Sequence, residues 1–310
     1  MRAVFFGTPA LAVPSLRALA RIANVVGVVC QPDRPFGRSQ ELHQPEVKVA
    51  ALELGIPVYQ PVKVRDGALA TWVAEQRADV ALVLAYGRIL PRPVLDAPRV
   101  GCINLHASLL PKYRGAAPIQ WAIIRGETRT GITLMQVDEG LDSGPMFSHH
   151  ELSIGPDETA GELSERMAEL AARVVEADLP KVVERQLQAV PQDESQVTLA
   201  PPLERANGRI DWSRSSSEVH NLVRGLAPRP GAHTTLAGKS LKISVTRRVE
   251  IAPPLRPGEV RVERPRVLLG TGDGAVELVR AQLEGKRELD ALSLANGRAL
   301  KDGDVLGADA

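Results

Sequence analysis

Gly101-Cys-Ile-Asn-Leu-His-Ala-Ser-Leu-Leu-Pro-Lys-Tyr-Arg-Gly115 indicates a buried strand that runs directly into a loop. Ile103 and Leu105 alternate with polar residues before Ser-Leu-Leu-Pro ends the strand. Because side chains alternate faces along a strand, Asn104 and His106 share one face, about 6.5 Å apart at ~3.3 Å per residue. Burying an amide and an imidazole is unfavourable unless both are hydrogen-bonded. The pair is therefore either a candidate site or a polar pair that only bonds the neighbouring loop.

A second stretch, Val137-Asp-Glu-Gly-Leu-Asp-Ser-Gly-Pro145, favours the site. Its Asp and Gly content predicts a turn-rich loop after a strand over residues 130–136, with Asp142 between glycines that permit a sharp bend. A carboxylate against an imidazole favours the protonated ring and fixes its tautomer, and an asparagine amide can stabilise a developing oxyanion. Asn104, His106 and Asp142 thus form a candidate set for acyl transfer. The sequence contains no Gly-x-Ser-x-Gly elbow, so the attacking group would come from the substrate.

The N-terminal part of the chain alternates apolar strands with helical patterns. Strands are predicted at 2–6, 24–30, 78–84 and 100–105, with helical patterns around 45–54 and 66–76. This alternation predicts an open, mostly parallel, doubly wound α/β sheet with helices on both faces. Ligands in such sheets bind at the carboxyl ends of the strands, where His106 and Tyr86 are expected to meet.

The composition changes in the second half of the chain. Thr159-Ala-Gly-Glu162 predicts a capping box that opens a long helix, which Pro180 is expected to bend or interrupt. Residues 189–208 are polar and rich in proline, which predicts a linker. Short strands follow at 241–247, 258–262, 267–269 and 276–280, a pattern typical of a small β-barrel. We therefore expect a first domain over residues 1–188 and a second over 209–310.

Composition excludes several classes of protein. The 310 residues include 44% hydrophobic side chains but no apolar run of about 18 residues, and the N-terminus enters a strand at once. We expect a cytoplasmic protein that spans no membrane, with Cys30 and Cys102 as reduced core thiols. His149 and His150 are adjacent and would face opposite sides of a strand, so no metal site is expected. Residues 209–310 carry 17 Lys/Arg against 13 Asp/Glu, which fits contact with a phosphate backbone or merely a solvated face.

Several long motifs, in this order, resemble those of the formyltransferases that use 10-formyltetrahydrofolate. The motifs are Phe6-Gly-Thr-Pro9, Gln31-Pro-Asp-Arg-Pro-x-Gly-Arg38, Ala85-Tyr-Gly-x-Ile-Leu-Pro91, Asn104-Leu-His106, Ser108-Leu-Leu-Pro-x-Tyr-Arg-Gly-Ala-Ala-Pro-Ile-Gln120, Met135-Gln-x-Asp-x-Gly-Leu-Asp-Ser-Gly144 and Arg209-Ile-Asp-Trp212. The resemblance extends to about residue 245. Within this family, the motifs are most similar to those of the members that act on methionyl-tRNA.

This resemblance implies a function and its parts. The formyl group of 10-formyltetrahydrofolate would move to the α-amine of methionine on initiator methionyl-tRNA, with Asn104, His106 and Asp142 as catalytic residues and no metal. The folate would contact Tyr86, Ile89, Leu90, Ser108, Leu109, Leu110 and Pro111. The second domain would be an OB-like barrel that binds tRNA, in a monomeric protein.

The same resemblance implies that the loop over residues 31–44 approaches the tRNA acceptor stem through Arg34 and Arg38. Ser39-Gln40-Glu41 departs from the more basic residues often found there, which predicts weaker phosphate affinity. Three other functions stay open: an aminosugar or purine-nucleotide formyltransferase, a formyltetrahydrofolate hydrolase that releases formate, and a tRNA-binding protein without catalysis. The first does not account for the arginine loop, and the intact Asn-His-Asp set argues against the last.

Overall fold

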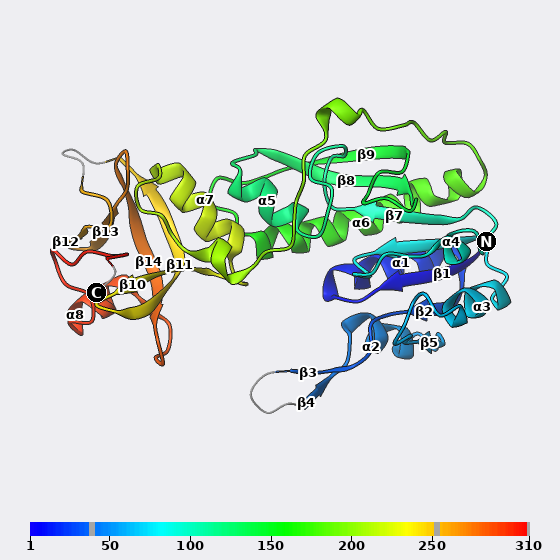
Figure 1. Cartoon of the computed structure of the whole chain (residues 1–310), viewed down its shortest axis with the longest axis horizontal. Helices are drawn as coiled ribbons and strands as arrows, with labels where there is room; N and C mark the ends of the chain where they lie inside the picture. The colour runs from blue at the N-terminus through cyan, green and yellow to red at the C-terminus, as the bar shows by residue number, and fades with distance from the viewer. Residues whose placement is uncertain (37–40, 251–254, 309–310) are drawn as a thin grey trace. The chain divides into compact units, whose positions relative to one another are not determined.

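The computed structural model describes residues 1–36, 41–250 and 255–308, which form two compact units (Figure 1). Unit 1 comprises Met1–Pro118, Thr130–Leu152 and Ser164–Pro201. Unit 2 comprises Ile119–Arg129, Ser153–Leu163 and Pro202–Ala310. The segment predicted as a linker, residues 189–208, is therefore divided between the two units.

Unit 1 is built on a seven-stranded sheet with the order β5-β2-β1-β6-β7-β8-β9. The strands are β1 (Arg2–Gly7), β2 (Asn24–Val29), β5 (Val58–Tyr59), β6 (Val80–Leu84), β7 (Cys102–His106), β8 (Arg129–Gln136) and β9 (Met146–Ser153). The first five strands run parallel, and β8 pairs antiparallel with β7. The predicted α/β class is confirmed, with an antiparallel edge that the apolar pattern alone did not indicate.

Helices and a small hairpin accompany this sheet. They are α1 (Val13–Ile22), α2 (Glu46–Glu53), α3 (Ala68–Glu75), α4 (Arg92–Leu95) and most of α6 (Ala160–Val183), the short turns η1 (Ala10–Ala12) and η2 (Glu194–Gln196), and the hairpin β3 (Arg34–Phe36) with β4 (Glu41–His43). Helix α5 (Pro118–Ile124) belongs to unit 2 apart from its first residue. The continuous apolar run of β1 is buried throughout Ala3–Phe6, as expected for a central strand of a covered parallel sheet.

Helix α6 begins as predicted and ends differently. The Thr159 hydroxyl accepts from the Glu162 N–H, while the Glu162 carboxylate accepts from the Thr159 N–H, which completes the capping box. The expected interruption at Pro180 is wrong, because the helix continues to Val183. Proline here removes one donor close to the helix end, and the Pro180 carbonyl still accepts from the Glu184 N–H.

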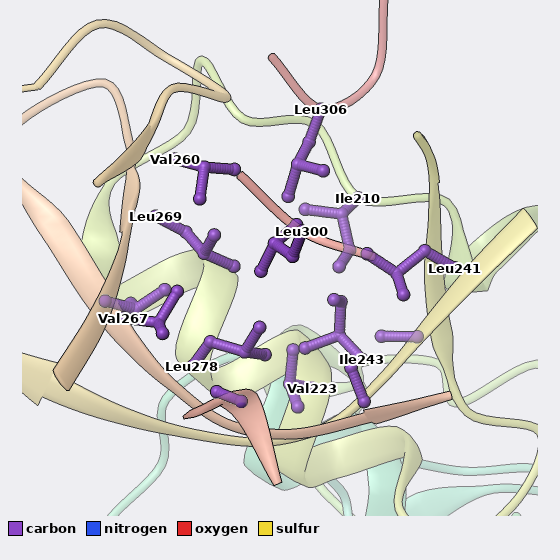
Figure 2. Packing of buried hydrophobic residues seen from close by; sticks show 14 of the residues in the cluster. Ile210, Val223, Leu241, Ile243, Val260, Val267, Leu269, Leu278, Leu300 and Leu306 are labelled. Carbon is purple, nitrogen blue, oxygen red and sulfur yellow. The ribbon is translucent and has the colours of Figure 1, made fainter. Parts of the chain in front are cut away.

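Unit 2 is built on a six-stranded antiparallel sheet, which agrees with the predicted β-rich C-terminal domain. Strands β10 (Ala232–Leu236), β11 (Lys239–Val249), β14 (Ala275–Leu283), β13 (Arg266–Gly270) and β12 (Val260–Glu263) lie in that order, and β15 (Leu289–Asp290) pairs with β14. Helices α7 (Ser216–Leu226) and α8 (Ala291–Asn296) and the turn η3 (Arg205–Gly208) complete the unit. Figure 2 shows its core, in which Val223 of α7 packs with Ile243 and Leu278 of the sheet.

Both cysteines lie in the core of unit 1. Cys30 and Cys102 are free and buried, as predicted, and burial raises the pKa of their thiols to about 11 and about 12. Both are therefore poor nucleophiles at neutral pH. Within the described ranges, no helix combines the length and the apolar character that crossing a bilayer requires.

Candidate active site

The end of strand β7 carries the first two predicted site residues. Asn104 lies opposite Met135, and His106 lies opposite Thr133 on the neighbouring strand β8. Being two residues apart on a strand, the amide and the imidazole share one face. Asn104 is half-buried, whereas the His106 side chain is only 5% exposed. The alternation read from the sequence therefore gives this local geometry correctly.

The imidazole of His106 has a defined orientation. Its Nε2 lies 2.9 Å from the carbonyl oxygen of Tyr113, and its Nδ1 lies 3.6 Å from Oδ2 of Asp142. Since a carbonyl only accepts, Nε2 must carry a proton. In the neutral ring Nδ1 is then unprotonated and faces the carboxylate, and a second proton would lie between the two groups. The structure thus brings His106 and Asp142 together, although they are far apart in sequence.

The loop that carries Asp142 has an unfavourable backbone conformation at this residue, and hydrogen bonds hold it in place. Asp142 adopts a left-handed conformation with φ of 50°, which non-glycine residues rarely occupy. Its Oδ2 accepts from the Gly115 N–H at 2.9 Å, and this contact aligns the carboxylate beside the imidazole. Gly144 is required for close packing, because a Cβ there would lie 2.0 Å from the carbonyl oxygen of Gln136.

Two buried residues that the sequence analysis did not assign support this loop. Gln192 donates from Nε2 to the carbonyl oxygens of Asp142 and Gly144, at 2.7 and 2.8 Å. The Arg114 guanidinium donates to Oε1 of Gln192 at 2.9 Å and to both carboxylate oxygens of Glu194. Arg114 lies within one of the motifs, but no role was predicted for it. Gln192 lies in the predicted linker. Their polar character gave no signal of burial, because only the fold brings the residues after α6 against this loop.

The residues predicted to bind the pterin have different environments. Tyr86 is buried in a core cluster and packs edge-on against Phe6 with ring centroids 5.3 Å apart. Among the residues that the structure describes, none makes a hydrogen bond to its hydroxyl, and burial raises the pKa of Tyr86 to about 12. Leu90 belongs to the same cluster, whereas Ile89 is 56% exposed. Ile89 is therefore the one of these three whose side chain is open to a ligand.

The segment Ser108–Pro111 is fixed by internal hydrogen bonds. The Ser108 hydroxyl donates to the Lys112 carbonyl at 2.6 Å, and Thr133 Oγ1 bridges the Ser108 carbonyl and the Leu110 N–H. Ser108 and Leu110 are buried, while Leu109 and Pro111 are half-buried. This segment therefore presents Leu109 and Pro111 rather than the serine hydroxyl.

The predicted tRNA loop is described only in part. Arg34 is exposed on β3, and Arg38 lies outside the described residues. The base of the loop is anchored by Asp33, whose carboxylate accepts from Gln60 and from Lys48, both at 2.7 Å. These two hydrogen bonds, led by that from Gln60, lower the pKa of Asp33.

The described residues contain no group of three or more His, Cys, Asp or Glu side chains placed to hold a metal ion. His150 pairs instead with Asp178, with Nε2 2.7 Å from Oδ2.

A surface cavity of about 420 Å³ lies between α1 and α6, lined by Arg17, Arg21 and Arg173 among others, and none of the predicted site residues lines it.

Comparison with known proteins decides the family. Residues 1–179 match the family described as formyl transferase, and residues 202–299 match its C-terminal domain. The chain belongs to the formyl transferase family. This family membership fits the convergence of an amide, an imidazole and a carboxylate at the end of β7.

Individual formyl transferases match the chain along its length. It is 56% identical to a methionyl-tRNA formyltransferase of Sorangium cellulosum, over 99% of this chain and 100% of that protein. It is 46% identical to one of Solibacter usitatus, over 99% of both chains. An N-formyltransferase from Helicobacter canadensis, in complex with folinic acid and dTDP-3-aminofucose, shares the fold with a TM-score of 0.69 and 18% identity, over 89% of this chain and 98% of that one.

Proposed function

We propose that this chain transfers the formyl group of 10-formyltetrahydrofolate to the α-amine of methionine on initiator methionyl-tRNA. The observation that carries the proposal is the 56% identity to a methionyl-tRNA formyltransferase across the whole of both chains. Similarity at 18% to an aminosugar formyltransferase supports only the fold, so it does not favour a sugar acceptor.

The reaction needs no covalent enzyme intermediate. The methionine amine attacks the formyl carbon and forms a tetrahedral intermediate with a negatively charged oxygen. Asn104 donates a hydrogen bond to that oxygen, and one such oriented donor typically contributes about 3–4 kcal/mol. His106 has Nε2 on the Tyr113 carbonyl and Nδ1 towards Asp142, so the protonated ring stabilises the negative oxygen by its charge. The carbon–N10 bond then breaks, and the new amide remains on the tRNA.

Proton transfer balances within the site. The attacking amine loses one proton and the leaving N10 gains one, so the reaction consumes no net proton. His106 Nδ1, which is unprotonated in the neutral ring and lies 3.6 Å from Oδ2 of Asp142, is the atom that accepts the amine proton and returns it to N10, directly or through water. The hydrogen bond from His106 Nε2 to Tyr113 keeps Nδ1 on the carboxylate side.

We assign the folate to the strand ends beside this set. The exposed side chain of Ile89, with Leu109 and Pro111, would contact the pterin and its linker, because a flat heteroaromatic ring binds in an apolar slot with a few backbone partners. Tyr86 and Leu90 would support that slot from the core, and Ser108 and Leu110 would fix its backbone. Arg34 and Arg38 would contact tRNA phosphates, as would the OB-like second domain.

A single assay tests the proposal. The protein is mixed with 10-formyltetrahydrofolate and charged initiator tRNA, and the product is analysed for N-formylmethionine. Parallel reactions replace the tRNA with an aminosugar nucleotide or omit any acceptor. Formylmethionine only with the tRNA supports the proposal. Formylated sugar, or formate released equally fast without an acceptor, would replace it by one of the alternative functions.

A further inference from the structure

The residues that follow helix α6 form part of the framework of the candidate site. Val190 exchanges two backbone hydrogen bonds with Met146, both 2.8 Å long. Further along, Thr198 and Ala200 bond the backbone of Arg114. Between these two attachments, Gln192 turns inward and is only 9% exposed. The segment is therefore fastened on both sides of one buried amide.

Every polar atom of that amide has a partner. Nε2 uses both of its protons, on the carbonyls of Asp142 and Gly144. Oε1 accepts from Arg114 Nε, and this contact excludes a flipped amide, because the flip would set an NH₂ group against the guanidinium. Arg114 is itself buried and is held by Glu194. The orientation of the Gln192 side chain is thus determined by the fold.

Gln192 bonds the backbone carbonyls of Asp142 and Gly144. The backbone conformation of these two residues sets the position of the Asp142 carboxylate. Asp142 has a left-handed backbone, which the chain does not favour by itself. Its carboxylate stands 3.6 Å from His106 Nδ1, so a small rotation of the loop would separate the pair. Misplacement by about 1 Å can slow an enzyme ~100-fold.

We propose that Gln192 is a positioning residue, which holds the Asp142 loop so that its carboxylate faces His106, with Arg114 as the group that orients the Gln192 amide. The expected change in kcat rests on the proposed function. The expected change in the surroundings of His106 rests on the geometry alone. Gln192 touches no reacting atom and acts only through Asp142.

The test uses the full-length protein and the variant Gln192→Met, which keeps the side-chain length but removes the donor and the acceptor. The matched control is Gln196→Met, since Gln196 lies in the same segment but is exposed, and its side-chain amide donates to Asp193 and not to the Asp142 loop. We expect Gln192→Met to lower kcat about 10- to 100-fold with KM for the tRNA changed less than about threefold. The control should stay within about twofold of wild type.

A double-mutant cycle separates positioning from a general structural defect. If Gln192 acts through Asp142, adding Gln192→Met to Asp142→Asn lowers kcat by less than about twofold further. A full multiplicative loss in the double variant would overturn the proposal.

A measurement without turnover keeps this inference distinct from the proposed function. In protein with ¹⁵N-labelled histidine, the His106 ring signals are assigned by their loss in His106→Asn. Gln192→Met should shift them in the same direction as Asp142→Asn does. Unchanged His106 signals in folded Gln192→Met would refute the positioning role, whichever acceptor the enzyme uses. Absence of formyl transfer by the wild type would instead refute the proposed function.

Discussion

Replacing Asp142 with asparagine tests the candidate site most directly. Asparagine keeps an oxygen that can accept the Gly115 N–H, which now bonds the carboxylate at 2.9 Å. It also tolerates the left-handed conformation, with φ of 50°, better than most residues do. The substitution therefore removes the negative charge that faces His106 with little effect on folding.

The distance between the two groups gives the size of the effect. Two unit charges 3.6 Å apart attract each other by about 4.6 kcal/mol at an effective dielectric constant of ~20. The Asp142 side chain is 20% exposed, so water screens part of this attraction. We take about 2.7–4 kcal/mol as the stabilisation lost in the transition state, which corresponds to a decrease of about 100- to 1,000-fold in kcat.

The assay measures initial rates of methionyl-tRNA formylation by wild type and Asp142→Asn, with thermal unfolding of both proteins. The control is Glu139→Gln, which removes an exposed carboxylate from the same loop and should leave kcat within about twofold. If Asp142→Asn turns over within about threefold of wild type while unfolding at the same temperature, the charge has no catalytic role and the reasoning fails.

Three further predictions concern stability. Gly144→Ala should destabilise the protein by roughly 2–4 kcal/mol in urea unfolding, because its Cβ would lie 2.0 Å from the Gln136 carbonyl oxygen, whereas Gly274→Ala has open space and should change little. Burial lowers the pKa of His220, so the unfolded chain binds a proton more readily than the folded one, and the free energy of unfolding should fall as the pH drops below about 6.5. Unfolding at pH 7.5, 6.5 and 5.5 checks this, and a pH slope in His220→Gln as steep as that of wild type would contradict it. Leu278→Ala in the core of Figure 2 should lower the free energy of urea unfolding by about 2–5 kcal/mol, since Leu278 is 1% exposed, and a loss below about 1 kcal/mol would contradict this prediction.

The sequence specified the features that depend on neighbouring residues. The continuous apolar runs of β1, β2 and β6 indicated buried strands. The shared face of Asn104 and His106 on β7 follows from a period of two, and the capping box at Thr159 follows from a spacing of three residues. The Asp-Gly content of the loop around Asp142 also indicated a sharp bend correctly.

Only the tertiary structure determined which distant segments meet. Contacts between segments far apart in the sequence leave no pattern in either segment alone. Three features depend on such contacts: the 3.6 Å distance between Asp142 and His106, the burial of Tyr86 and the antiparallel pairing of β8. Gln192 illustrates the limit best. In a polar, proline-rich stretch it resembles a linker residue, and it becomes a buried support of the site because the sheet presents two carbonyls that need its amide.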